Sequence, residues 1–194
     1  MRIQLTAGDA LVVVDVQKDF LPGGNLAVPG GDAIIPILNN AIALFQQLEL
    51  PIIATRDWHP PDHCSFLAQG GSWSPHCIAG TAGAEFATKL QLPGTAHIIS
   101  KATTPNAEAY SGFDGTPLQE LLQTLKVKRV FIGGLATEYC VRNTAFDALQ
   151  FGYTVFILIE AVMAIDLQPG DGQHAMAEMV RLGAATIHFE ELAA

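Results

Sequence analysis

The stretch RVFIGGLATEYCVRNTAFDALQFG, residues 129–152, joins an apolar run to a segment with helical spacing. Its first part, 129–135, is apolar after the first residue, as is typical of a strand buried on both faces of a parallel sheet. Its second part, 137–152, predicts a helix that ends at Gly152, because glycine readily adopts the left-handed conformation found at helix C-termini. A strand followed closely by a helix is the building unit of α/β proteins.

The same alternation recurs along the rest of the chain. Further strands are predicted at 10–16, 51–57, 96–101, 153–161 and 184–189, and further helices at 32–48, 116–125 and 170–183. The expected N-caps are Asp32, Thr116 and Thr137. Because the strands are continuous apolar runs, the sheet should be covered by helices on both faces. The sequence therefore predicts an α/β fold, a doubly wound three-layer sandwich around a six-stranded parallel sheet, in one domain over residues 1–194.

Composition limits the classes of partner and compartment. The chain has 194 residues, 49% of them hydrophobic and 15% charged, with a formal net charge of -9 and no run of basic residues. Nucleic acid and anionic membranes are therefore poor partners, and no apolar run reaches the roughly 18 residues of a membrane span. Three cysteines, a low and odd number, favour a reducing compartment over a disulfide framework. We expect a cytoplasmic protein. The sequence leaves its oligomeric state open, and a homo-oligomer is possible.

Three charged residues stand where predicted strands end. In an open parallel sheet, ligands bind beyond the carboxyl ends of the strands, which makes Asp15, Asp57 and Lys101 candidates for a site. Asp15 lies within an apolar run, and a buried carboxylate is unfavourable unless it is paired. An ion pair with Lys101 would explain both residues. The ordinary alternatives are an aspartate that caps a loop and a lysine that reaches solvent.

Cys140 is a candidate nucleophile. With Thr137 as N-cap it would lie in the first turn of the helix, where unpaired N–H groups and the helix dipole favour an anion. A cysteine in such a position can have a lowered pKa and attack an electrophile. The alternative is an inert thiol that fills space in the core.

A second group of residues has the composition of a metal site. Asp57 and His59 are two residues apart, and His76 follows in an irregular segment rich in Gly, Pro, Trp and His. One carboxylate and two imidazoles suit zinc, iron or manganese and leave positions open for water or a ligand. Two alternatives are local hydrogen bonding by the histidines and a structural zinc site that includes Cys64 and Cys77.

Five segments together resemble one known family. They are DVQKDFLPGGNLAVPGGD (15–32), RDWHPPDHCSF (56–66), SWSPHCIAGTAGAEF (72–86), SKATTPNAEAYSGF (100–113) and GGLATEYCVRNTAFDA (133–148). In this order they resemble the nicotinamidases of the isochorismatase-like cysteine hydrolase superfamily. The resemblance covers most of the chain, and it is carried by the whole set of segments.

The resemblance implies an activity and a set of site residues. The activity is metal-dependent hydrolysis of nicotinamide to nicotinate and ammonia through a Cys thioester, extending to pyrazinamide, in the salvage of NAD. The implied residues are a catalytic triad of Asp15, Lys101 and Cys140; the backbone amides of Ala136 and Cys140 as an oxyanion hole after a cis peptide between Leu135 and Ala136; metal ligands Asp57, His59 and His76, with His63 a ligand in some members; and the pocket aromatics Phe20, Trp73 and Tyr110. The implied cofactor is one divalent transition metal, zinc first, with iron or manganese as alternatives. No role is implied for Cys64 or Cys77.

Two other functions remain as alternatives. One is an isochorismatase or another amidohydrolase of the same fold; an isochorismatase binds a dianion and would need arginines in its pocket. The other is a metal-binding protein without catalytic activity, in which Cys140 would be unreactive.

Overall fold

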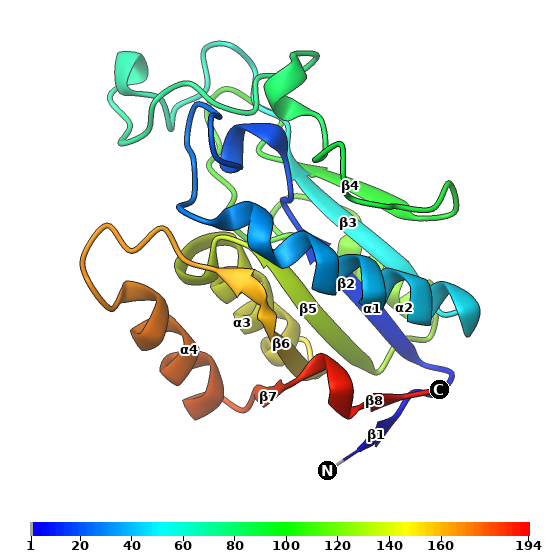
Figure 1. Cartoon of the computed structure of the whole chain (residues 1–194). Coiled ribbons are helices and arrows are strands. Elements are labelled where there is room, and N and C mark those ends of the chain that lie inside the picture. Colours follow the sequence, from blue (N-terminus) through cyan, green and yellow to red (C-terminus); the bar gives the residue numbers. More distant parts are fainter. Residues whose placement is uncertain (1) are drawn as a thin grey trace.

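The centre of the structure, a computed structural model that describes residues 2–194, is a parallel β-sheet (Figure 1). Within these residues it has six strands in the order β4-β3-β2-β5-β6-β7, and every neighbouring pair is parallel. The strands are β2 (Asp9–Val14), β3 (Ile52–Asp57), β4 (His97–Lys101), β5 (Arg129–Leu135), β6 (Thr154–Met163) and β7 (Ala185–Ile187). The predicted fold class is confirmed.

Helices cover both faces of the sheet (Figure 1). On one face lies α1 (Ile35–Gln47), whose Leu38 and Phe45 share a buried cluster with Leu11 of β2. The other face carries α2 (Leu118–Thr124), α3 (Arg142–Gln150) and α4 (Asp171–Arg181). Their buried residues form a second cluster with Val12 of β2. Successive side chains of a strand point to opposite faces, so the apolar run of β2 serves both clusters.

The order of the strands reverses between β2 and β5. From β2 the chain adds β3 and β4 on one side, then crosses to place β5, β6 and β7 on the other. Such a reversal is where open α/β sheets place their ligands, beyond the carboxyl ends of the strands. At this end Gly134 pairs with Val14 and has a φ of 137°. A Cβ on Gly134 would lie 2.0 Å from the Val14 carbonyl oxygen, so only glycine permits this close approach.

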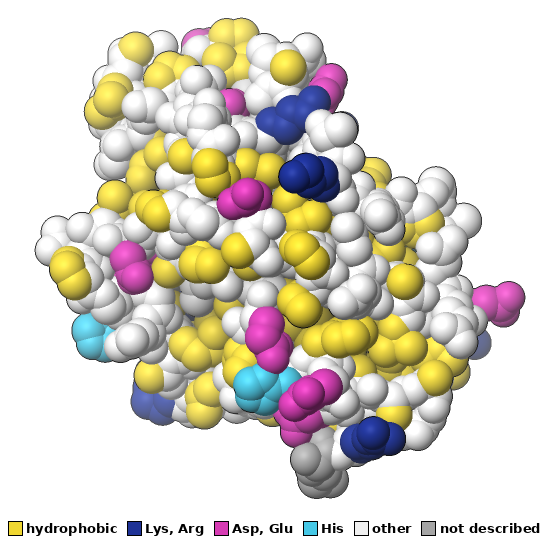
Figure 2. Space-filling view, in the orientation of Figure 1, with side chains coloured by type: hydrophobic (Ala, Val, Ile, Leu, Met, Phe, Trp, Pro, Cys, Tyr) yellow, Lys and Arg dark blue, Asp and Glu magenta, His cyan; other side chains and the backbone are white. Residues whose placement is uncertain are grey.

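Long loops gather above the carboxyl ends of β2 and β3 (Figure 1). They belong mainly to the segment 58–96, in which His59 bridges to Ile78 and Phe66 to Trp73. The short helices of the fold are η1 (Lys18–Phe20), η2 (Gly31–Ile34), η3 (Leu67–Gln69), η4 (Ala82–Ala84), the π-helical turn η5 (Thr137–Val141) and η6 (Phe189–Glu191). On the face shown in Figure 2, the few Lys and Arg side chains are dispersed among hydrophobic and uncharged groups. Within residues 2–194, no helix combines the length and hydropathy needed to cross a membrane.

Several local predictions need correction. Asp32 lies in η2 rather than at the start of α1, and α2 begins at Leu118, where the Thr116 hydroxyl accepts a hydrogen bond from the Leu118 N–H at 3.3 Å. Thr137 opens a π-helical turn whose N-cap is Ala136. These segments enter their helices through tighter or wider turns, which apolar spacing does not reveal.

The chain ends also differ from the prediction, while one helix end agrees with it. A two-stranded parallel sheet pairs β1 (Ile3–Gln4) with β8 (Leu192–Ala193), and it was not predicted. Strands of two residues are too short for any periodicity to show. Gly152 does end its helix as predicted, with a φ of 87° after α3.

Candidate active site

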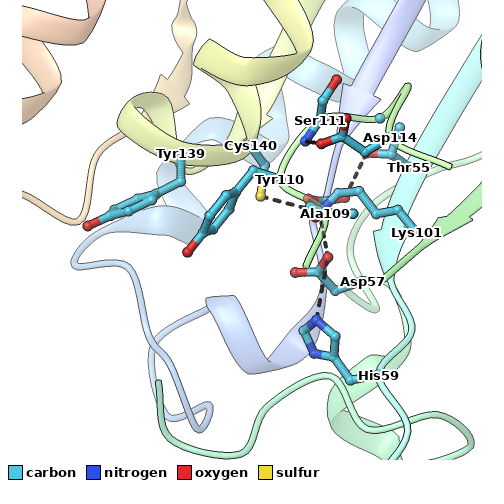
Figure 3. A network of polar contacts seen from close by, with 12 residues as sticks. Thr55, Asp57, His59, Lys101, Ala109, Tyr110, Ser111, Asp114, Tyr139 and Cys140 are labelled. Carbon is cyan, nitrogen blue, oxygen red and sulfur yellow. Dashed lines mark hydrogen bonds and ion pairs between the residues drawn. The ribbon is translucent and has the colours of Figure 1, made fainter. Parts of the chain in front are cut away.

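The three residues of the implied triad meet at the carboxyl end of the sheet. Val14 pairs with Thr55 in the sheet, so Asp15, one residue later, lies at the same edge as the ends of β3 and β4. The Nζ atom of Lys101 lies 3.0 Å from Asp15 Oδ2. It lies 3.4 Å from Cys140 Sγ (Figure 3). Asp15 is 0%, Lys101 1% and Cys140 6% exposed, so the group is shielded from water.

Lys101 is surrounded by acceptors. Its Nζ atom donates to Asp57 Oδ1 at 2.5 Å and to the Ala109 carbonyl at 3.0 Å, and Asp57 is its neighbour in the register of β3 and β4. Burial alone would lower the pKa of Lys101, but the carboxylates of Asp15 and Asp57 raise it well above its usual value. The side chain is therefore an ammonium that pairs with two buried acids.

Asp15 has the environment of a proton acceptor. It follows β2 with a φ of 50°, and its Oδ1 atom accepts a hydrogen bond from the Thr55 hydroxyl at 2.6 Å. Burial raises the pKa of the Asp15 carboxyl, Lys101 opposes this, and the charge of Asp57 adds to it. A carboxyl with a raised pKa beside a thiol can accept and return a proton near neutral pH.

The prediction of a lowered thiol pKa at Cys140 is wrong. The residue lies in the π-helical turn η5, and it is buried. Burial raises the pKa of the Cys140 thiol well above its usual value; Lys101 opposes this, and the carboxylates of Asp15 and Asp57 add to it. The resting side chain is therefore a thiol, and its deprotonation must be coupled to a proton acceptor.

The turn before Cys140 has the backbone that the resemblance implies. The peptide bond between Leu135 and Ala136 is cis. The Ala136 carbonyl accepts hydrogen bonds from the N–H groups of Tyr139 at 3.1 Å and Val141 at 3.2 Å, which closes the turn. Ala136 and Cys140 both line one small cavity.

The three expected metal ligands also come together. Ligand atoms of Asp57, His59 and His76 all lie within 4.8 Å of one another, and the three residues are buried. The Nδ1 atom of His59 bonds the His76 carbonyl at 3.0 Å, and that of His76 bonds the Ser74 carbonyl at 2.7 Å. These contacts fix the tautomers and leave each Nε2 as a potential ligand.

The chemistry of this group fits a metal ion. His59 Nε2 is buried and finds no hydrogen-bond partner among residues 2–194. Burial lowers the pKa of His59 to about 4, so its ring is neutral and has a free lone pair. An orphaned imidazole nitrogen beside a carboxylate is what a divalent cation would satisfy.

His63 is close to this group, but its ring is engaged elsewhere. Its ring stacks on that of His59 with 4.2 Å between centroids. Its Nδ1 atom contacts the Ser65 hydroxyl at 2.7 Å, and its Nε2 atom contacts the Ala107 carbonyl at 3.0 Å. A second possible ligand group joins His59 and His63 to Glu108. In the structure as it stands, the other contacts of His63 compete with metal binding.

The thiols of the two cysteines outside the triad are not among the possible metal ligands. Cys64 and Cys77 are free thiols, and neither belongs to any of the possible ligand groups found among residues 2–194. Burial is the main cause of a strongly raised pKa at Cys77, which keeps this thiol protonated. The alternative of a structural zinc site with these cysteines therefore finds no support.

The cavity between these groups is small and has aromatic walls. Its volume is about 30 Å³. The Trp73 indole N–H donates to the Tyr110 hydroxyl at 2.9 Å, and Tyr139 packs edge-on against Trp73 with 5.1 Å between ring centroids. The lining includes the expected aromatics Phe20, Trp73 and Tyr110, and also Leu26, Ser65, Glu108, Tyr139 and Ile165, which the sequence did not single out.

One buried residue missed by sequence reasoning supports the metal group. The side-chain amide of Gln17 donates to the Asp57 carbonyl at 2.7 Å and accepts from the Asp57 N–H at 2.8 Å. It also donates to the Ala84 carbonyl at 2.9 Å. The sequence did offer a signal for Gln17, because it is a polar residue only two positions after Asp15 and close to an apolar run.

Known proteins resemble this chain over most of its length. The isochorismatase domain family matches residues 9–191. A nicotinamidase of Acinetobacter baylyi is 38% identical to this chain, and the match covers 96% of this chain and 95% of the relative.

Two solved structures share the fold. The pyrazinamidase of Pyrococcus horikoshii, in complex with zinc, is 51% identical with a TM-score of 0.90, covering 93% of this chain and 99% of that one. PnC1 of L. infantum, in complex with nicotinate, is 35% identical with a TM-score of 0.90, covering 100% and 99%. By its fold, by the matched residues and by these relatives, the chain belongs to the isochorismatase family.

Proposed function

We propose that the protein is an amide hydrolase that converts nicotinamide to nicotinate and ammonia, and that it acts on pyrazinamide in the same way. The observation that carries this proposal is the meeting of Cys140, Lys101 and Asp15 beside a group of metal-ligating side chains. The aromatic side chains that line the pocket favour a flat heteroaromatic ring. The similarity to a nicotinamidase and a pyrazinamidase over most of the chain supports the same substrate class.

In the first step, Cys140 attacks the amide. As Sγ forms a bond to the carbonyl carbon, the thiol proton passes to Asp15 and the π electrons of the carbonyl move to its oxygen. Asp15 then gives this proton to the amide nitrogen, the C–N bond breaks and ammonia leaves. The product of this step is a thioester between Cys140 and the nicotinoyl group.

In the second step, water replaces the sulfur. Asp15 takes a proton from a water molecule as the water oxygen bonds to the thioester carbon. The C–S bond then breaks, the proton on Asp15 returns to Cys140, and the product departs as the acid, which gives its remaining proton to solvent and becomes nicotinate. Splitting the hydrolysis in this way replaces one difficult attack by water with two easier steps.

Lys101 and the backbone supply the electrostatics of both steps. The ammonium of Lys101, 3.4 Å from Sγ, stabilises negative charge that forms on the sulfur. The N–H groups of Ala136 and Cys140 would donate to the oxyanion, and losing one such donor typically costs about 3 kcal/mol. The aromatic rings of Phe20 and Trp73 would hold the pyridine ring between them.

Asp57, His59 and His76 would hold one divalent transition metal, for which we propose zinc. When bound, the metal would act as a Lewis acid that anchors the ring nitrogen of the substrate and withdraws electrons from the ring. The zinc complex of the Pyrococcus pyrazinamidase supports this choice, as does the orphaned Nε2 atom of His59.

The lining of the pocket disfavours an isochorismatase. A dianionic substrate calls for cationic side chains. Among the described residues, those that line the cavity include no Arg or Lys, and Lys101 beneath it is already paired with two carboxylates.

The decisive experiment measures ammonia release from nicotinamide by the purified protein, before and after treatment with a chelator. We expect release that stops on metal removal and returns with added zinc. Benzamide serves as a comparison substrate because it lacks the ring nitrogen, and isochorismate, which contains no nitrogen, is followed by its own consumption. A protein that binds metal but releases no ammonia from either amide and does not consume isochorismate would support the non-catalytic alternative.

A further inference from the structure

A buried acidic side chain beside the nucleophile has no part in the proposed reaction. Glu138 is 5% exposed and lies in η5, the turn that also carries Cys140. Its Oε1 atom accepts hydrogen bonds from the backbone N–H groups of Ile165 at 2.9 Å and Asp166 at 2.8 Å. Its Oε2 atom is buried and has no hydrogen-bond partner in the described part of the chain. Burying a carboxylate with one oxygen unpaired is unfavourable by itself. The two hydrogen bonds of Oε1 therefore indicate what this side chain does.

The two amides belong to the connection between β6 and α4, residues 164–170. Asp166 has a φ of 53°, which residues other than glycine seldom adopt. Its side chain accepts a hydrogen bond from the Gly172 N–H at 2.8 Å, at the start of α4. A Cβ on Gly172 would lie 2.4 Å from the Cβ of Ala164, so α4 packs directly against this connection. Glu138 and the start of α4 therefore both contact the connection.

The connection contributes to the substrate pocket through one side chain. Ile165 lines the small cavity together with Tyr139 and Cys140. Three successive residues of η5 therefore have three separate contacts: Glu138 with the connection, Tyr139 with the pocket wall, and Cys140 with Lys101. A wider π-helical turn spreads neighbouring side chains in this manner and is common at functional sites.

We propose that Glu138 is a positioning residue that keeps Ile165 in the pocket wall, so that it governs substrate binding more than the chemical step. This inference rests on the proposed hydrolysis of nicotinamide. Without the two bonds, the backbone of Ile165 and Asp166 would relax and the pocket wall would open at Ile165. Cys140 would keep its contact with Lys101, because that contact does not pass through the connection.

Two substitutions separate geometry from charge. Glu138→Gln removes the charge but keeps a carbonyl oxygen where Oε1 accepts both bonds. Glu138→Asp keeps the charge but is one methylene too short to reach both amides. We expect KM for nicotinamide to change less than about twofold in Glu138→Gln and to rise about tenfold in Glu138→Asp, with kcat within about threefold in both.

The path of the effect is tested with Ile165. Ile165→Ala should also raise KM about tenfold, since it removes the same part of the wall. If Glu138 acts through Ile165, the double variant Glu138→Asp/Ile165→Ala should show no further rise, whereas independent effects would multiply to about 100-fold. Asp171→Ala is the matched control, because Asp171 accepts a bond from the Gln168 N–H in the same connection at 2.9 Å but does not line the small cavity.

Hydrogen exchange tests the contact without any substrate. The amides of Ile165 and Asp166 should exchange slowly in the wild-type protein and in Glu138→Gln, and at least about tenfold faster in Glu138→Asp. Unchanged exchange in Glu138→Asp overturns the proposal, as does a tenfold rise of KM in folded Glu138→Gln or a multiplicative double variant. A wild-type protein that does not hydrolyse nicotinamide would instead refute the proposed function, and the exchange rates would then decide whether Glu138 holds the connection.

Discussion

The Nζ atom of Lys101 lies 3.4 Å from the Sγ atom of Cys140, and both side chains are buried. The same ammonium contacts Asp15 at 3.0 Å and Asp57 at 2.5 Å. Lys101 therefore connects the thiol, its proton acceptor and the group of possible metal ligands. Among the described residues, no other cation is paired with either carboxylate, since the His59 ring, 3.9 Å from Asp57, is neutral.

Substitution of Lys101 tests this connection. Lys101→Met should lower turnover by at least about 100-fold, because Asp15 loses its partner and charge on Cys140 loses its stabilisation. It should also reduce the free energy of unfolding by about 3–5 kcal/mol, as expected when one member of a buried ion pair is removed. Ammonia release and urea unfolding measure the two effects. A folded Lys101→Met protein with near-normal turnover would exclude Lys101 from the mechanism.

Metal content tests the second group. Protein purified without added metal should contain about one transition metal ion per chain, as measured by elemental analysis, and His76→Ala should lose it because two ligands hold a divalent ion weakly. Cys64→Ala is the matched control, since Cys64 belongs to none of the possible ligand groups in the described residues. Full metal occupancy after substitution of all three residues, Asp57, His59 and His76, would disprove the assignment.

The proximity of Asp15, Asp57 and Lys101 could be predicted from the sequence because the sheet is parallel. Parallel strands bring their carboxyl ends to one edge, so Asp15, Asp57 and Lys101 had to lie near one another once the strands were identified. The order of the strands, which no local pattern encodes, decided that β2 and β5 are neighbours. The identification of Ala136 and the pocket aromatics came from the resemblance alone.

Features that depend on tertiary contacts escaped prediction. The direction of the pKa shift at Cys140 was wrong because the sequence indicated a helix start but not the depth of burial, and burial raises a thiol pKa. Ile165 follows β6 with no distinguishing pattern, and only the fold brings its N–H to Glu138, 27 residues earlier in the chain. The pairing of β1 with β8 likewise joins the two ends of the described chain.

A surface pair should give the stability a pH dependence away from the active site. His188 Nδ1 contacts Glu160 Oε1, and this hydrogen bond raises the pKa of His188. Burial raises the pKa of Glu160, but the bond from His188 together with other contacts lowers it overall. Because the pKa of His188 is raised on folding, the pair stabilises the fold fully below pH 6.5, the ordinary pKa of histidine. This stabilisation is lost as the pH rises through the pKa of the folded state. The stability from a lowered glutamate pKa is present above its ordinary 4.5 and is lost as pH falls.

The pair should therefore stabilise the fold most between pH 4.5 and 6.5. We expect His188→Gln to lower Tm more at a pH of about 5.5 than at about 8.5, as judged by thermal unfolding at both values. His174→Gln is the control, since the described residues show no ion pair at this exposed histidine. An equal loss of Tm at both pH values in His188→Gln would show that the pair does not titrate with folding.

Covalent catalysis by Cys140 is the prediction on which the mechanism depends most. Rapid acid quench of the protein during turnover of nicotinamide should yield a species heavier by one nicotinoyl group, detected by intact-protein mass. The aldehyde analogue of nicotinamide has no leaving group, so Cys140 should add to it and stop at a tetrahedral thiohemiacetal. Its oxygen would occupy the site of the Ala136 and Cys140 amides, and this resemblance to the transition state should make it a tight inhibitor.

Substitution of the cysteines completes this test. Cys140→Ala should bind metal and nicotinamide but release no ammonia and form no adduct, whereas Cys64→Ala and Cys77→Ala should still hydrolyse the amide. Cys77 is a demanding control because it is as deeply buried as Cys140 but donates its backbone N–H to Asp19, at 2.7 Å, and has no contact with Lys101 among the described hydrogen bonds. If Cys140→Ala kept its ammonia release, water would have to attack the amide directly, and the thioester mechanism would be wrong.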